Sequence, residues 1–184
     1  MTDHRADEVL RFWFGEGAER GQTRKRWFEK NATFDTEIRN RFLPLYEELA
    51  TSDDWLSSSS YCLARIVVLD QFPRNMFRGK ARAFSTDSLA LAAAKHAVAM
   101  GYDRDRLPVE KQFVYLPFEH SESLADQERA CELMKLLGEE LYGWAVKHKV
   151  IIERFGRFPH RNAILGRAST SEEIEFLKQP GSGF

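Results

Sequence analysis

The sequence has few cysteines and almost no net charge, and each of these absences excludes a class of protein. Its two cysteines, Cys62 and Cys131, each lie inside an apolar helical pattern, which favours buried thiols over a disulfide framework or a zinc knuckle. The 27 basic and 28 acidic side chains leave a formal charge of -1. Because no overall field attracts nucleic acid or an anionic membrane, we expect neither as a partner.

Long apolar runs are also missing. No stretch approaches the roughly 20 uncharged residues that span a bilayer, and residues 1–11 lack the apolar run of a secretory signal. We therefore expect the protein to stay in the cytoplasm. With 184 residues, 43% of them hydrophobic, the chain can bury one sizeable core but is short for two. This predicts a single domain over residues 1–178 and a flexible C-terminal tail over residues 179–184.

Helical spacing of apolar residues covers most of the chain. Ala6–Phe14 reads as a helix that ends at Gly15, and Phe34–Leu49 as an amphipathic helix bent at Pro44. The alanine-rich segment Asp87–Met100 has acceptor oxygens at its start and a glycine after its end. No alternating strand pattern or Asn-Gly hairpin signal occurs. The fold class predicted is therefore all-α.

Prolines and glycines predict where the remaining helices end. Pro73 is expected to end the helix that follows the serine run at 57–60, and Pro117 to interrupt the helix that begins at Pro108. The apolar pattern from Leu133 to Phe155 is expected to divide near Gly143. Ser123 with Asp126 resembles a capping box at the start of the next helix, and Thr170 with Glu173 caps a last short helix that ends before Pro180.

One phrase occurs twice, each time between an apolar helix and the capped start of the next. Phe72-Pro73-Arg74-Asn75 is followed by Gly79 and Ser85-Thr86-Asp87; Phe158-Pro159-His160-Arg161-Asn162 is followed by Gly166 and Ser169-Thr170. The two phenylalanines are 86 positions apart. The phrase is either a remnant of internal duplication or two separate solutions to one loop problem. Proline, asparagine and glycine serve the turn itself, but the turn does not require arginine.

Two interpretations of these arginines stay open. In the first, they donate to loop carbonyls and to nearby carboxylates, and so fasten long connections. The side chains concerned are Arg74, Arg78, Arg161 and Arg167, with Asp70 and Asp87 as acceptors. In the second, some of them form a pocket for a phosphate or a carboxylate, together with the N–H groups at the helix starts.

Two histidines lie where catalytic groups tend to concentrate. His120 and His160 both follow a proline-marked break and have charged or hydroxyl neighbours, whereas His96 and His148 lie within helices, where a structural role is expected. If the fold brought the first two together with Glu119 and Arg161, an acid/base pair would face an anion-stabilising arginine. No zinc motif, Walker loop, dinucleotide fingerprint or nucleophile elbow is present, and the sequence identifies neither a cofactor nor a metal site.

The motifs together resemble a bacterial family known as domain of unknown function 924, and the match covers almost the whole chain. The segments that carry the resemblance are Val9–Gly15, Leu69–Asn75, Arg78-Gly79, Tyr115–Glu122 and Arg154–Arg167. The resemblance implies antiparallel helix pairs in a tetratricopeptide-repeat-like, right-handed array of about eight helices. The roughly 34-residue period of those repeats is absent from this sequence, and the family brings no established activity.

Two functions remain in competition, and the sequence does not establish whether the protein is an enzyme. The leading hypothesis is a polar pocket that binds a small anionic molecule, with ligand-binding residues Arg74, Asn75, Arg78, Arg154, Arg161 and Asn162 and catalytic candidates Glu119, His120 and His160. The alternative is a protein-interaction module that binds its partner in a helical groove, through aromatic residues such as Trp13, Trp27, Phe28 and Trp55. A purely structural accessory domain is a third reading.

Overall fold

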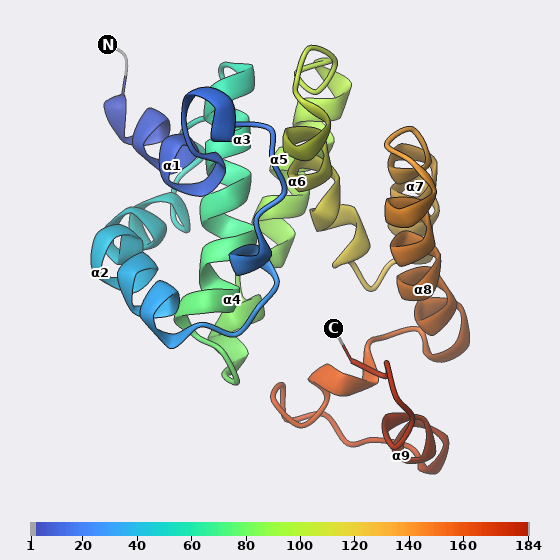
Figure 1. Ribbon diagram of the computed structural model, residues 1–184. Coiled ribbons are helices and arrows are strands. Elements are labelled where there is room, and N and C mark those ends of the chain that lie inside the picture. The colour runs from blue at the N-terminus through green and yellow to red at the C-terminus, as the bar shows by residue number, and fades with distance from the viewer. Residues whose placement is uncertain (1–2, 184) are drawn as a thin grey trace. The chain divides into compact units, whose positions relative to one another are not determined.

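The computed structural model describes residues 3–183, and within this part of the chain the regular secondary structure is helical, without strands (Figure 1). The prediction of an all-α fold is therefore confirmed. The helices are α1 (His4–Phe14), α2 (Ala32–Leu49), α3 (Ser59–Ile66), α4 (Phe72–Met76), α5 (Asp87–Ala99), α6 (Pro108–Glu119), α7 (Leu124–Lys135), α8 (Glu139–Phe155) and α9 (Ser171–Leu177). Shorter helical turns are η1 (Gly17–Glu19), η2 (Lys25–Trp27), η3 (Val67–Gln71), η4 (Ala81–Phe84) and η5 (Pro159–Arg161).

The chain forms two compact units. The first extends to Arg78 and includes Arg82–Pro117, and the second comprises Gly79–Ala81 and the chain from Phe118 onward. The single domain over residues 1–178 and the right-handed tetratricopeptide-like array stay predictions. So does the flexible tail, whose last residue, Phe184, lies outside the described residues. Between residues 3 and 183 no helix is both long and apolar enough to cross a membrane.

Aromatic rings fill the core of the first unit. Trp13 and Phe14 from α1 are fully buried, and both rings pack edge-to-face on Phe113 of α6 with centroids 5.6 and 5.4 Å away. Phe42 of α2 packs on Phe72 of α4 with centroids 4.8 Å apart. Because buried aromatic pairs contribute both area and specific geometry, they tie the first helix to α2, α4 and α6.

The helix that follows the serine run does not end at Pro73, so that prediction was wrong. Ser58 caps α3 as expected, but a π-helical turn, η3, then continues directly into α4, which contains Pro73. Proline has no N–H to donate to the carbonyl four residues earlier, that of Leu69. The buried hydroxyl of Thr86 donates to that carbonyl instead, at 2.6 Å. The missing hydrogen bond is thus supplied from outside the helix.

Of two further predicted breaks, one lies elsewhere and the other is absent. α7 and α8 are separated at Gly138, whose φ of 123° is open to glycine, whereas Gly143 lies inside α8. The predicted division near Gly143 was therefore wrong, because a helix interior tolerates a single glycine at a cost of about 1 kcal/mol. α6 likewise continues through Pro117 and ends at Glu119. Pro117 removes one backbone hydrogen bond without ending the helix.

Both cysteines are free thiols in positions that suppress their reactivity. Cys62 is buried, and burial raises the pKa of its thiol to about 11. Cys131 is partly exposed, and burial again raises its pKa above the usual value. Since the thiolate is the nucleophile, neither side chain is activated at neutral pH.

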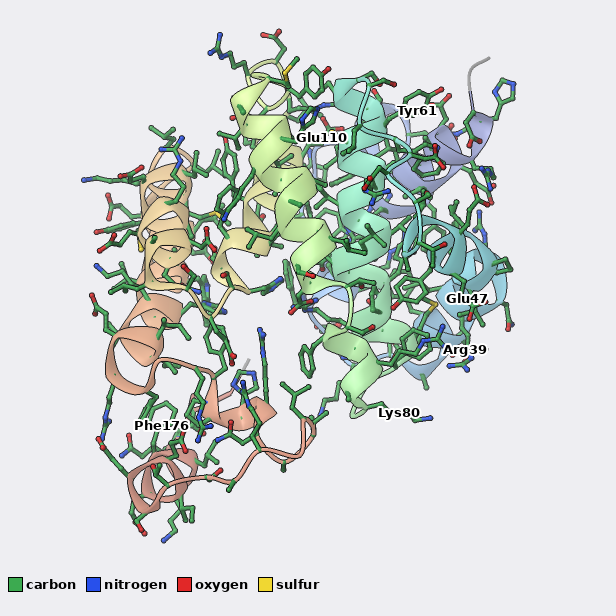
Figure 2. All side chains as sticks on the ribbon, turned by 180° about the vertical axis from the view of Figure 1, so that it is seen from behind. Arg39, Glu47, Tyr61, Lys80, Glu110 and Phe176 are labelled. Atoms are coloured by element: carbon green, nitrogen blue, oxygen red, sulfur yellow. The ribbon has the colours of Figure 1, made fainter. Side chains whose placement is uncertain are left out.

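The second unit is built on an antiparallel pair of helices. α7 and α8 are joined by a three-residue turn and lie side by side (Figure 1). Ile151, Ile152 and Phe158 form a buried apolar cluster, against which Phe155 and Phe176 pack. Phe176, labelled in Figure 2, lies on α9. This cluster anchors the loop that carries the second Phe-Pro phrase.

Candidate functional site

The sequence-predicted site residues are divided between the two units. The first unit holds Arg74, Asn75 and Arg78; the second holds Glu119, His120, Arg154, His160, Arg161 and Asn162. The two groups have different surroundings.

The arginines of the first phrase are held by carboxylates. Arg74 donates to both carboxylate oxygens of Asp87, at 2.8 and 3.0 Å, and to the carbonyl of Asp70 at 2.6 Å. Arg78 donates twice to Asp35, at 2.9 Å each, and Asn75 donates to the same carboxylate at 2.7 Å. Bidentate pairs of this kind fix geometry as well as charge. These contacts favour the loop-fastening interpretation for the first phrase.

In the second unit, the end of α6 is fixed by a buried glutamine. The Gln127 side chain is fully buried, and its Nε2 donates to the carbonyls of Glu119 at 2.6 Å and Ser121 at 2.7 Å. These carbonyls follow the last helical turn, where backbone acceptors lack helical partners. The clamp therefore fixes the backbone on both sides of His120.

The Glu119 carboxylate faces a histidine that the sequence reading assigned to a structural role. Oε2 of Glu119 lies 3.2 Å from Nδ1 of His148 on α8, and both residues are buried. The same Nδ1 lies 2.9 Å from the carbonyl of Trp144. Both neighbours of Nδ1 are acceptors, so the proton of a neutral ring belongs on Nδ1. Nε2 is then left as the basic nitrogen of His148.

The second phrase gathers three polar side chains around one buried ring. Phe158 is fully buried, and its ring centroid lies 5.9 Å from that of His148 and 5.6 Å from that of His160. The guanidinium of Arg161 lies over the same ring, 4.4 Å from its centroid. Arg161 also donates to the carbonyl of His120 at 3.0 Å. The fold therefore brings both candidate histidines and Arg161 to the Glu119–His148 pair.

A carboxylate from the turn before α7 positions this loop. Glu122 accepts the backbone N–H of Phe158 at 2.8 Å and both terminal nitrogens of Arg167, at 2.7 and 2.9 Å. Burial alone would raise the pKa of Glu122, but Arg167 and the Phe158 N–H lower it below the usual value. The charged form of Glu122 is thus the one that holds Phe158 in place.

Arg154 and Asn162 bond to side chains of the loop and of α9. Arg154 pairs with Glu172 at 2.8 Å, and Asn162 donates to Ser169 at 3.1 Å and accepts from Arg167 at 3.0 Å. These contacts brace the connection between α8 and α9.

The cap predicted for the last helix is present as a capping box, whereas the prediction of one at Ser123 was wrong, because Ser123 makes no side-chain cap hydrogen bond. Thr170 accepts from the backbone N–H of Glu173, and the Glu173 carboxylate accepts from the backbone N–H of Thr170. Arg157 donates twice to the same carboxylate, at 2.7 and 2.8 Å. Arg157 lowers the pKa of Glu173 to about 2. The start of α9 is therefore fixed by a charged glutamate.

The electrostatic state of His148 follows from its surroundings. Burial lowers its pKa to about 4, the Trp144 carbonyl opposes this shift, and the positive charges of His120, Arg161 and His160 reinforce it. His148 is therefore a neutral base at pH 7 beside a buried carboxylate. His120 and His160 are partly exposed, whereas Glu119, His148 and Arg161 are buried. The partly exposed histidines are thus the part of the cluster nearest solvent.

Among residues 3–183, no three His, Cys, Asp or Glu side chains are grouped so that they could hold a metal ion. The arrangement in the second unit instead offers proton transfer and anion binding: a neutral imidazole, a carboxylate, two partly exposed histidines and an arginine. His148 was missed from the sequence because nothing in its helical neighbourhood marks which carboxylate it will face. Its helix position alone predicted a structural histidine.

The aromatic residues considered for an interaction surface are mostly buried. Trp13, Trp27 and Trp55 are at most 7% exposed, whereas Phe28 is 59% exposed. Three of these four rings therefore belong to the packing of the first unit. The predicted aromatic groove needs all four rings at the surface, and of the four Phe28 alone is exposed.

Comparisons with known proteins agree with the resemblance seen in the motifs. The family described as "Bacterial protein of unknown function (DUF924)" matches residues 9–181. A solved structure of a protein of unknown function from Agrobacterium tumefaciens is similar, with a TM-score of 0.84 and 40% sequence identity. The similarity covers 96% of this chain and 99% of that one. None of the curated proteins compared with the chain matches it.

Proposed function

The chain belongs to this bacterial family of proteins of unknown function, and we propose from its own residues that the second unit binds a small anion, a phosphate or a carboxylate, at His120, His160 and Arg161. The Glu119–His148 pair next to them supplies the proton chemistry of the site. We place this activity in the cytoplasm, the compartment expected from the sequence.

One observation carries the proposal: a buried carboxylate lies 3.2 Å from a buried imidazole, and the same imidazole shares a phenylalanine ring with His160 and Arg161. A loop needs proline, asparagine and glycine, as both phrases show, but it does not need this concentration of ionisable groups. Perturbed titratable groups gathered beside an irregular segment are typical of functional sites.

The charges predict how binding and proton uptake are coupled. His120, His160 and Arg161 lower the pKa of His148 because their positive charges oppose its protonation. An anion bound to those groups offsets the repulsion, so the pKa of His148 rises when the site is filled. Near pH 5, His148 is then protonated to a larger extent in the bound state of the site than in the empty state. Such uptake is the first requirement of an acid–base catalyst.

Isothermal titration calorimetry with inorganic phosphate, and separately with acetate, tests the proposal. Titrations at pH 5 in two buffers of different ionisation enthalpy report the protons taken up on binding. We expect Arg161→Gln to weaken binding about tenfold, since a charge-assisted hydrogen bond is lost. We expect His148→Gln to bind but to take up no proton.

Arg129→Gln provides the matched control, because Arg129 is an exposed arginine of the same unit that pairs with Glu132 at 2.6 Å. It should bind both anions as the parent does. Heat from neither anion, or equal affinity in the Arg161→Gln and Arg129→Gln proteins, would count against the site. A melting curve of each variant establishes that it is folded before it is titrated.

A second candidate, a protein-interaction module, rests on exposed apolar side chains of the second unit. Leu136 after α7 is 77% exposed, and Val150 and Trp144 on α8 are 51% and 46% exposed. If a second copy of the chain covers them, sedimentation velocity should show a concentration-dependent dimer that Trp144→Ser weakens. If the protein stays monomeric at all concentrations, these exposed side chains do not mediate self-association.

A further inference from the structure

An open cavity of about 430 Å³ in the first unit has a charged lining that takes no part in the proposed anion site. It lies where the start of α3, the end of α5 and the start of α6 come together. The polar residues of its lining are Arg20, Ser59, Tyr102, Asp105, Arg106 and Glu110. Its volume falls in the range of roughly 300–1,000 Å³ typical of small-molecule sites.

A buried carboxylate shared by two arginines forms one part of this lining. Glu110, labelled in Figure 2 at the beginning of α6, is only 2% exposed. Its Oε1 accepts from Nε and Nη2 of Arg20, at 2.9 and 2.7 Å, and its Oε2 lies 3.5 Å from Nη1 of Arg106. One carboxylate thus offsets one of two guanidinium charges. The two arginines together retain one positive charge toward a ligand.

Both guanidinium groups are held in place and keep donors to offer. Arg106 is fixed because its Nε and Nη2 donate to the hydroxyls of Ser59 and Ser60, at 2.8 and 2.9 Å. Within the described residues, Nη1 of Arg20 makes no hydrogen bond, and Nη1 of Arg106 makes only the long contact to Glu110. Planar guanidinium groups with spare N–H donors suit a carboxylate.

The lining also contains an exposed acid, which decides the class of ligand. Asp105 is exposed and lines the same cavity. A simple anion would be attracted by Arg20 and Arg106 but repelled by Asp105. A molecule that carries an ammonium group as well as a carboxylate satisfies both signs of charge, and the opposite pairing makes each contact favourable.

We propose that this cavity binds a small zwitterion of the amino-acid type, with its carboxylate on Arg20 and Arg106 and its ammonium group on Asp105. The site is independent of the anion site proposed in the second unit. Glu110 acts as a positioning residue, because it holds the two guanidinium groups at one place without itself facing a positive group of the ligand.

Titrations monitored by two-dimensional amide NMR on the whole protein test the proposal. The probes are glycine, β-alanine and 4-aminobutyrate, which separate the two charges by increasing lengths, with acetate and n-butylamine as single-charge probes. We expect at least one amino acid to shift the amides of Ser59, Tyr102 and Leu107, and to bind about tenfold more tightly than acetate or butylamine. The amides of His120 and Arg161 report separately on the other site.

Two substitutions assign the charges. Arg20→Gln should weaken the binding of the amino acid and of acetate alike, by about tenfold, because both molecules bind the guanidinium through a carboxylate. Asp105→Asn should weaken the binding of the amino acid, because the ammonium group loses its partner. It should strengthen the binding of acetate, because a repulsive negative charge is removed. Arg82→Gln is the control: Arg82 is 45% exposed and pairs with Glu47, as Arg20 is 44% exposed and pairs with Glu110.

The proposal is overturned if none of the three amino acids shifts these amides. It is also overturned if Asp105→Asn changes the affinities for the amino acid and for acetate in the same direction, because Asp105 then does not bind the ammonium group. Arg20 lies on an exposed segment, so Arg20→Gln should keep the parent melting temperature within the change shown by Arg82→Gln. If it melts earlier than that, Arg20→Lys, which keeps the charge, must restore binding of the amino acid for the proposal to stand.

Discussion

The two Phe-Pro phrases use nearly the same residues but form different local structures. In the first unit, Phe72 and Pro73 begin α4, which continues from the π-helical turn η3. In the second, α8 ends at Gly156 with a left-handed φ of 68°, and Pro159 begins the single turn η5. The preceding backbone, rather than the phrase, determines the conformation. This difference favours two separate loop solutions over a preserved duplication.

Their arginines also have different partners. Arg74 in the first phrase forms two hydrogen bonds with the Asp87 carboxylate. Arg161 in the second lies over Phe158 and donates to the backbone carbonyl of His120. Bidentate pairing with a carboxylate fastens a loop, whereas the ring and carbonyl contacts of Arg161 hold its guanidinium beside the Glu119–His148 pair. The comparison therefore agrees with loop fastening at the first phrase and with the anion site proposed at the second.

Replacing each arginine by methionine should separate these two roles most strongly. Arg74→Met removes the guanidinium from buried Asp70 and from Asp87, and breaking such a pair costs roughly 3–5 kcal/mol of the free energy of unfolding. Arg161→Met removes at least the hydrogen bond from the charged guanidinium to the His120 carbonyl and should cost about 1.5–3 kcal/mol. Urea unfolding of the two variants measures both. Equal losses would show that the phrases do the same structural job.

The pH dependence of stability should come from the second phrase's surroundings. His148 has a folded pKa of about 4, below its ordinary 6.5. Between these values the unfolded chain binds a proton that the folded chain does not, so the free energy of unfolding decreases as pH falls from 6.5 to 4. The loss amounts to about 3 kcal/mol. Below pH 4 both states are protonated and this contribution stops changing.

Unfolding curves for the parent and for His148→Gln at pH 7, 6, 5 and 4 measure this effect. The difference in stability between the two proteins should shrink or reverse by the stated amount across that window, because glutamine does not titrate. Acidic groups such as Glu173, with a pKa of about 2, lose their contribution at lower pH. Parallel pH profiles for the two proteins would contradict the assignment of a neutral, buried His148.

The Ser-Thr pairs that follow the phrases also differ. Thr86 makes no side-chain cap for α5. Its hydroxyl donates to the carbonyl of Leu69, to which Pro73 cannot donate because it has no backbone N–H. Thr86→Val leaves this buried bond unmade and should cost about 2 kcal/mol. Thr36→Val is the control, because the exposed Thr36 hydroxyl donates within its own helix. Thermal unfolding that shows no difference between the two variants would argue against Thr86 as the partner of the proline-interrupted helix.

Local sequence signals predicted the helices whose ends depend on local chemistry. Asp87–Met100 was expected and α5 spans Asp87–Ala99, and the Thr170 capping box formed as expected. The error at Pro73 arose because a distant group compensates for a local defect. Pro73 should end a helix, but Thr86, thirteen residues later in the chain, supplies the missing donor. No local pattern contains that information.

The candidate site was predicted in part for the same reason. Proline-marked breaks drew attention to His120 and His160, because irregular segments are visible in the sequence. His148 lies inside a regular helix, and its role depends on Glu119 reaching it across the fold at 3.2 Å. The spacing between positions 119 and 148 carries no sign of that distance. The pairing of arginines with Asp35 and Glu122 was likewise a matter of tertiary structure.

The smallest expected change in the free energy of unfolding concerns the second Ser-Thr pair. Thr170 accepts from the backbone N–H of Glu173 and closes a capping box, so Thr170→Ala should cost about 1 kcal/mol. Ser123→Ala is the matched control, because Ser123 is the N-cap of α7 and makes no side-chain cap hydrogen bond. Urea unfolding should show a loss for the first variant and almost none for the second. If both lose the same amount, the reciprocal bonds with Glu173 add nothing, and the second Ser-Thr pair would act only through N-cap backbone conformation.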